Sequence, residues 1–124
     1  MNALILKEEL LKTYDIYIEG FKKNDMSLIN SIIKFPIAIL KDGIIEMSDF
    51  YPINPKKLKI EKEWDHSTDW KFEITAINEN NAHINASAVR RKIDGSLIEK
   101  VSAFYGFYKI KGDWKMCSYS EIIS

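Results

Sequence analysis

Cysteine, proline and glycine are all scarce in this sequence. Its 124 residues include one cysteine, three prolines and five glycines, and no stretch is rich in glycine, proline or serine. A flexible linker between domains would need such a stretch, so we expect a single domain over residues 1–124. The lone Cys117 excludes an internal disulfide, and a chain of this length can bury a core without one. We interpret Cys117 as a small buried apolar group rather than a nucleophile.

An excess of charge of either sign is also missing. Eighteen acidic residues balance eighteen lysines and arginines, which gives a net charge of zero. An extended nucleic-acid site or an anionic membrane surface needs a concentrated positive field on its protein partner. The charge balance therefore predicts neither nucleic acid nor membrane as the main partner.

Long apolar runs are absent as well. The apolar residues 3–6 are followed directly by Lys7, Glu8 and Glu9, and such a run is too short for a secretory segment or a bilayer span. We therefore predict a cytoplasmic protein. Neither His66 nor His83 stands at metal-ligand spacing from another histidine or from the cysteine, so we predict no metal and no cofactor.

The first third of the chain has the pattern of helices. Over residues 4–23 the apolar side chains Leu10, Tyr14, Tyr17, Ile18 and Phe21 recur at helical spacing. Gly20 would cost such a helix about 1 kcal/mol relative to alanine, which indicates either close packing or tolerance near the helix end. Asn24 and Asp25 end this helix and cap a second one, with Ile32 and Ile33 inward, that stops before Phe35-Pro36.

The remainder has the pattern of strands. Residues 37–40 and 44–47 flank Lys41-Asp42-Gly43, a strong hairpin signal. Residues 48–67 are ambiguous, because Asn54-Pro55 predicts a helix start while the apolar residues that follow alternate as in a strand; we favour a short helix. Alternation then predicts long antiparallel strands over residues 68–78, 82–92, 97–111 and 114–123.

The strand over residues 97–111 is apolar on both faces. Ala103 and Tyr105 point one way, and Phe104 and Tyr108 point the other way. Two or three helices can cover only one of these faces. The second face, which we expect Val89 and Tyr119 to extend, would stay exposed on a monomer, so we predict a homodimer through the outer face of the sheet.

This order of elements resembles the nuclear-transport-factor-2-like (NTF2-like) superfamily. The most specific matches are Phe21-Lys22-Lys23-Asn24-Asp25, the segment Ala88-Val89-Arg90-Arg91-Lys92-Ile93-Asp94-Gly95-Ser96, and Tyr105 with Gly112-Asp113-Trp114-Lys115-Met116. They are similar to small bacterial members of the SnoaL-like kind. The resemblance implies an α+β fold in which N-terminal helices pack on a strongly curved antiparallel β-sheet, the NTF2-like or cystatin-like cone.

The resemblance also implies a pocket at the open end of the cone. In steroid-isomerase-like members a tyrosine on the first helix donates to an enolate oxygen, and Tyr17 stands at that place. The carboxylate base of those members falls near Lys41 or Asp42, although an Asp in a hairpin turn is already explained by turn geometry.

Other candidate site residues come from the strands and the segment before them. By alternation Arg90 projects from a small apolar row, where it can anchor a carboxylate or phosphate or pair with an internal acid. Trp64 and Tyr105 can line a cavity or belong to the core. His66 follows Asp65 and precedes Ser67, but adjacent residues point in different directions, so this run is not a triad by itself.

Three functional hypotheses follow. In the leading one, the cone binds a small apolar molecule, with an anionic group in one version, through Tyr17, Trp64, His66, Arg90 and Tyr105. The second is a non-catalytic dimerisation or protein-interaction module whose cone is filled by side chains. The third is a SnoaL-like or ketosteroid-isomerase-like proton-transfer enzyme, with Tyr17 and His66 as catalytic candidates. The fold does not choose among them.

Overall fold

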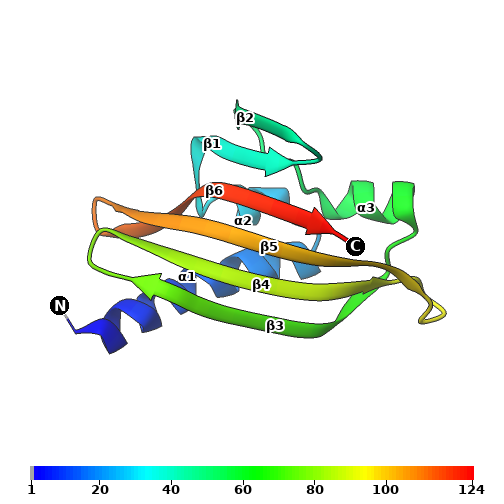
Figure 1. Cartoon of the computed structure of the whole chain (residues 1–124), viewed down its shortest axis with the longest axis horizontal. Helices are drawn as coiled ribbons and strands as arrows, with labels where there is room; N and C mark the ends of the chain where they lie inside the picture. Colours follow the sequence, from blue (N-terminus) through cyan, green and yellow to red (C-terminus); the bar gives the residue numbers. More distant parts are fainter. Residues whose placement is uncertain (1) are drawn as a thin grey trace.

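One mixed sheet with helices on a single face makes up the fold. The structure is a computed structural model that describes residues 2–124. The elements are, in chain order, α1 (Ala3–Lys22), α2 (Met26–Asn30), β1 (Ile33–Lys41), β2 (Ile44–Ser48), α3 (Pro55–Lys62), β3 (His66–Ile77), β4 (Asn81–Arg91), β5 (Leu97–Ile110) and β6 (Asp113–Ile123). The six strands lie in the order β2-β1-β6-β5-β4-β3 (Figure 1).

The predicted α+β cone is confirmed, with one difference in strand direction. All neighbouring strands are antiparallel except β1 and β6, which run parallel. Figure 1 shows α1 crossing behind β3, β4 and β5, while the face of the sheet toward the viewer carries no helix. We call the helix-covered face the inner face and the other the outer face. No helix within residues 2–124 is both long and apolar enough to cross a membrane.

The helix ends follow the capping residues of the sequence. Asp25 caps α2 by accepting a hydrogen bond from the Leu28 amide at 3.1 Å, and Asn54 caps α3 by accepting from the Lys56 and Lys57 amides. The short helix expected within the ambiguous segment is therefore confirmed. The second helix is shorter than predicted, because it ends at Asn30 and Ile33 already begins β1; in the turn between them, the Ile32 carbonyl accepts from the Met116 amide at 2.8 Å.

Close packing explains the glycine inside α1. A Cβ atom on Gly20 would stand 2.8 Å from Ile29 Cγ1 and 3.1 Å from the Ile29 backbone nitrogen. Ile29 belongs to α2 and is fully buried. Of the two alternatives that the sequence left open, the structure thus selects helix–helix contact.

Tyr119 corrects one expectation about the outer face. It is opposite Tyr105 in the register of β5 and β6, and only 3% of it is exposed, so it lies inside the cone. The register shifts between Gly106 and Phe107, where β6 carries an extra residue. This bulge puts Met116 and Tyr119 on the same face although they are three positions apart, which strict alternation does not anticipate.

Candidate functional site

Four tyrosines from four parts of the chain meet inside the cone. They are Tyr17 on α1, Tyr51 in the loop before α3, Tyr105 on β5 and Tyr119 on β6. Tyr105 lies 5.6 Å from Tyr17 and 5.4 Å from Tyr119 between ring centroids, and Tyr51 lies 5.4 Å from Tyr119. All four are at least 94% buried, so their packing joins the first helix to the centre of the sheet.

The hydroxyls of this cluster are largely engaged with other side chains. The Tyr17 and Tyr51 hydroxyl oxygens are 2.8 Å apart and share a hydrogen bond. The Tyr119 hydroxyl donates to Glu121, whose other carboxylate oxygen lies 3.4 Å from Lys41 Nζ. Glu121 is a buried carboxylate, and these two partners supply the compensation that such a group needs.

Burial keeps the tyrosines protonated. It raises the pKa of Tyr17, Tyr51, Tyr105 and Tyr119 well above the usual value near 10. At neutral pH these hydroxyls therefore remain neutral and cannot act as bases.

The cavity beside this cluster is small. Its volume is about 40 Å³, and it is lined by Tyr17, Ile18, Phe21, Ile53, Ser67, Trp70, Ala86, Ser87, Ala88, Arg90, Val101, Ala103, Tyr105 and Tyr119. This space suits one or two water molecules, whereas sites for drug-sized ligands span roughly 300–1,000 Å³. The described lining contains no aspartate, glutamate or histidine, so no proton-accepting side chain of these types faces the space.

Arg90 lines the cavity and is held by an internal acid. Its Nη1 lies 2.5 Å from Glu99 Oε2, and both oxygens of Glu99 also accept from Lys62 Nζ at 2.8 Å. Burial opposes ionisation of Glu99, but hydrogen bonds from Lys62 and Arg90 outweigh it and lower the pKa of the carboxyl. Of the two roles weighed for Arg90, the structure shows the internal pair, and Lys62 extends that pair to α3.

The five predicted site residues divide into two groups. Tyr17, Tyr105 and Arg90 line the same cavity. Trp64 is buried beside it, with its indole nitrogen donating to Ser67 Oγ at 3.0 Å, but it is not among the lining residues. His66 also lies off the cavity, and its Nδ1 is 2.9 Å from Asp65 in a half-exposed pair.

The sequence did not single out Tyr51 and Glu121. Tyr51 lies in the segment without clear periodicity, so no pattern placed it near Tyr17. Glu121 stands two residues after Tyr119 on β6 and shares its face. The i, i+2 spacing of Tyr119 and Glu121 predicts that they share one face of the strand. Only the bulge shows that this face is the inner one. Within residues 2–124 no cluster of three or more His, Cys, Asp or Glu side chains could hold a metal ion.

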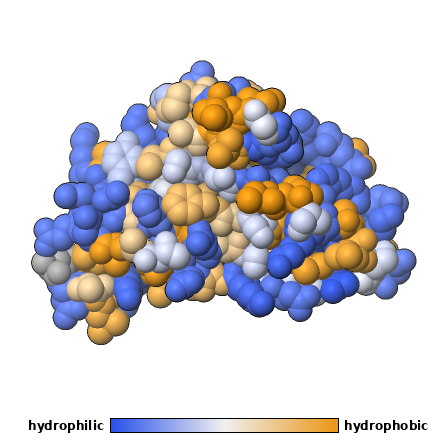
Figure 2. Space-filling model, viewed as in Figure 1, coloured by the Kyte–Doolittle hydropathy of each residue, from blue (hydrophilic) through white to orange (hydrophobic). Residues whose placement is uncertain are grey.

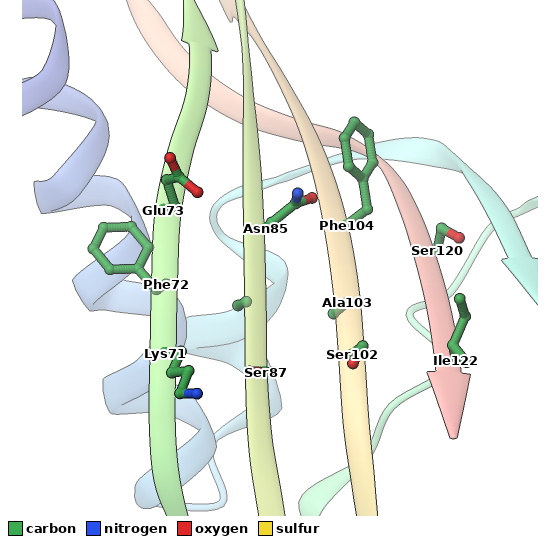
Figure 3. A pocket seen from close by; sticks show the side chains of 11 residues that line it. Lys71, Phe72, Glu73, Asn85, Ser87, Ser102, Ala103, Phe104, Ser120 and Ile122 are labelled. Carbon is green, nitrogen blue, oxygen red and sulfur yellow. The ribbon is translucent and has the colours of Figure 1, made fainter. Parts of the chain in front are cut away.

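The outer face of the sheet carries a larger depression, the outer groove. It has a volume of about 510 Å³ and crosses β3, β4, β5 and β6. Figure 3 shows that its floor consists largely of short polar side chains, with Phe104 and Ile122 on the β5 and β6 side; the residues lining it are Lys71, Phe72, Glu73, Asn85, Ala86, Ser87, Ser102, Ala103, Phe104, Ser120 and Ile122.

Exposed apolar side chains continue from this groove toward the hairpin of β1 and β2. Leu40 pairs with Ile45 on one side and with Ser120 on the other, so these residues share the outer face. We call Leu40, Ile45, Met47, Phe104 and Ile122 the apolar stripe; Ile45 is 82% exposed and Met47 is 63% exposed. Figure 2 shows apolar surface gathered over β1 and β2 and again near the end of β6. The expected outer apolar surface is present, but mostly through other residues than those foreseen.

Comparison with known families gives one match. The family profile described as "NTF2-like protein (DUF6841)" matches residues 56–121, more than half of the chain. No curated protein shows significant sequence similarity to the chain.

Solved structures share the whole fold at low sequence identity. An NTF2-like protein of unknown function from Shewanella baltica OS155 superposes with a TM-score of 0.67 at 18% identity, covering 100% of this chain and 98% of that one. An NTF2-like protein from Cytophaga hutchinsonii ATCC 33406 gives 0.70 at 11% identity, with 100% of both chains covered. A protein of unknown function with a cystatin-like fold from Nostoc punctiforme PCC 73102 gives 0.64 at 12% identity, covering 100% and 94%. At these identities the likeness concerns the fold alone.

Proposed function

The chain belongs to the NTF2-like protein family DUF6841, and we propose that it is a non-catalytic interaction domain that forms a homodimer through the outer face of its sheet. The observation that carries this proposal is the apolar stripe beside the outer groove. Large apolar side chains that gather on one face of a soluble domain mark an interaction site.

The contents of the cone interior support binding by the outer face of the sheet rather than catalysis inside the cone. A proton-transfer enzyme needs a base within hydrogen-bond reach of its substrate, and the described cavity lining offers only hydroxyls, apolar groups and one paired arginine. The buried carboxylate of Glu121 is already engaged by Tyr119 and Lys41. A cavity of about 40 Å³ also leaves little space for a substrate.

A second copy of the chain is the occupant that suits the outer face. Two copies related by a twofold axis present the same patch to each other, so the apolar stripe can be covered by its own counterpart. Serines 87, 102 and 120 form a floor of short side chains that permits close approach of a facing sheet. Because the net charge is zero, two copies have little overall repulsion to overcome.

Sedimentation equilibrium of the purified chain tests the homodimer. We expect a dimer at micromolar concentration and a monomer for the double variant Ile45→Asp/Met47→Asp, because the carboxylates would have to be buried in the apolar contact. The matched control is Ile60→Asp on α3, where Ile60 is 72% exposed and lies outside the outer face; it should leave the dimer intact. A monomeric parent chain, or dissociation by the control alone, would contradict the proposal.

A second candidate function has one specific observation in its favour. Within residues 2–124, only Nη1 of the Arg90 guanidinium forms a hydrogen bond, so Nε and Nη2 remain available on the wall of the cone cavity. The acidic group of a small apolar molecule would accept hydrogen bonds from these nitrogens, and its apolar part would contact Tyr17 and Tyr105. Side chains that line the cavity would have to move to admit it. Native mass spectrometry of protein purified from its own host separates the two: a retained small molecule supports this candidate, and a bare dimer supports the first. A cytoplasmic location stays a prediction.

A further inference from the structure

A second depression, the α1–β3 groove, lies outside the cone at the edge of the sheet. It has a volume of about 240 Å³ and is lined by Tyr14, Ile18, Lys22, Trp70, Lys71 and Phe72. Trp70 and Ile18 also line the cone cavity, so these two side chains form the wall between the two spaces. None of the described lining residues is acidic.

Aromatic rings of the groove are exposed in a fixed arrangement. Trp70 is 53% exposed and Phe72 is 44% exposed, which is high for neighbouring large aromatics on a strand. The register of β3 shifts between Thr68 and Lys71, and the indole nitrogen of Trp70 donates to the Ser67 carbonyl at 3.2 Å. Phe72 stacks on Tyr14 with ring centroids 5.2 Å apart, and in Figure 3 its ring lies on the side of β3 toward α1, at the edge of the outer groove that it also lines.

The Tyr14 hydroxyl has no hydrogen-bond partner among the residues that the structure describes. The side chain lines the groove and the residue is only 6% exposed, yet its hydroxyl has no hydrogen-bond partner within residues 2–124. The hydroxyl oxygen is not among the buried atoms that lack a partner, so it reaches the solvent side of the groove, where a ligand can accept from it. Burial and the nearby Asp15 raise the pKa of Tyr14 to about 12, so the hydroxyl is available as a donor at neutral pH.

The charge of the groove suits a ligand that carries a negatively charged hydrogen-bond acceptor. Lys22 makes no ion pair with any described residue. Of the neighbouring acids, Glu19 pairs with Lys23 at 3.1 Å and Asp69 accepts from Thr68 at 3.2 Å, whereas Asp15 lies close enough to Tyr14 to raise its pKa. The groove therefore combines two lysines without an ion pair among the described residues, Lys22 and Lys71, with one unused donor and two exposed aromatic faces.

We propose that the α1–β3 groove binds a planar aromatic carboxylate of one or two rings. Its ring packs against Trp70 and the exposed face of Phe72, and its carboxylate accepts from the Tyr14 hydroxyl and pairs with Lys22. The volume, which is below the roughly 300–1,000 Å³ of drug-sized sites, limits the ligand to that size. This site lies beside the dimer surface and shares Lys71 and Phe72 with the outer groove, while Tyr14, Lys22 and Trp70 line only the α1–β3 groove of the two.

Titration of the full chain with 1-naphthoate, followed by amide and indole NMR shifts, tests the site. We expect saturable shifts at the Trp70 indole and the Phe72 amide, and no binding of 1-naphthylmethylamine, which has the same ring and the opposite charge. Tyr14→Phe should raise the Kd about tenfold, because it removes a hydrogen bond to a charged group. It should leave the thermal midpoint unchanged, since that hydroxyl has no partner within the protein.

Two lysine variants provide the matched comparison. Lys22→Gln should raise the Kd about threefold, the size expected for an exposed ion pair. Lys7→Gln should leave it unchanged, because Lys7 is exposed near the start of α1 and lines neither groove. Equal affinities of the parent chain and Tyr14→Phe, equal binding of the amine, or shifts confined to residues around Arg90 and Tyr105 would each overturn the proposal. Shifts of the Trp70 indole that depend on protein concentration without naphthoate would assign the groove to a second copy and overturn it as well, since Trp70 does not line the outer groove.

Discussion

Arg90 and Glu99 face each other across β4 and β5, and they form an ion pair beside the cone cavity that Arg90 lines. Both side chains are at least 90% buried, whereas Lys62, the second partner of Glu99, is 36% exposed. A charge in such a place is tolerated only while it is paired. The same carboxylate therefore holds the guanidinium on the cavity wall and ties α3 to the sheet.

Replacing this carboxylate should destabilise the protein more than removing its exposed partner. We expect Glu99→Gln to lower the free energy of unfolding by about 3 kcal/mol, because it leaves Arg90 buried with a neutral partner. Lys62→Gln is the control and should cost less than about 1 kcal/mol. Urea denaturation of the two variants and the parent chain measures the difference, and equal losses would show that the Arg90 pair contributes little.

The same residue gives a dependence on pH with a definite sign. Hydrogen bonds from Lys62 and Arg90 outweigh burial and hold the pKa of Glu99 below its usual value of 4.5. The stabilisation is therefore complete above pH 4.5 and is lost as the pH falls through the lowered pKa of the folded state. The difference in unfolding free energy between the parent chain and Glu99→Gln should shrink over that acidic range, and a constant difference would exclude this linkage.

At the scale of elements, the contact between α1 and α2 shows how packing overrides helix propensity. Gly20 lies where the side chain and backbone of Ile29 come closest to α1. The short α2 has few stabilising features of its own beyond the Asp25 cap. Its position therefore depends on this approach to α1.

Gly20→Ala tests the contact directly. Helix propensity alone would make the alanine variant more stable by about 1 kcal/mol. Overpacking of a close contact costs about 1–3 kcal/mol, and backbone atoms cannot move aside as a flexible side chain can. We expect a net loss of about 1 kcal/mol in urea denaturation, while Ser27→Ala on the exposed side of α2 stays near neutral. A more stable Gly20→Ala protein would mean that α2 moves away at little cost.

At the scale of the whole molecule, the two faces of the sheet have different contents. The inner face is filled by tyrosines and aliphatic side chains around a cavity of about 40 Å³. The outer face has short polar residues in its groove and the apolar stripe beside it. A filled cone and an uncovered apolar stripe support the proposal that this domain binds its partner through the outer face.

Thermal unfolding at different protein concentrations is the matching prediction. If folding and dimerisation are linked, a hundredfold increase in concentration should raise the Tm on the order of 5 °C. In the Ile45→Asp/Met47→Asp variant the Tm should be independent of concentration, because a monomer unfolds in a unimolecular reaction. A concentration-independent Tm in the parent chain, measured by circular dichroism, would argue against a dimer that is stable at these concentrations.

The sequence by itself determined the elements, because periodicity, capping residues and turn residues act locally. Helix α1, the hairpin of β1 and β2, the helix after Asn54 and the long final strands all follow from such signals, as does the α+β cone. It also placed Tyr17, Tyr105 and Arg90 on inward positions, which the structure confirms. Trp64 and His66 were less predictable, since their segment has no periodicity that fixes a direction.

Only the tertiary structure decided what fills the cone and what covers the sheet. The bulge in β6 turned Tyr119 and Glu121 inward, and a register shift of one residue reverses every side chain beyond it. The pairing of Arg90 with Glu99 depends on the contact between two strands. The unused hydroxyl of Tyr14 depends on which side chains pack around its ring, such as Phe72. Local patterns specify which face of an element is apolar, but the space left between packed elements depends on all of them together.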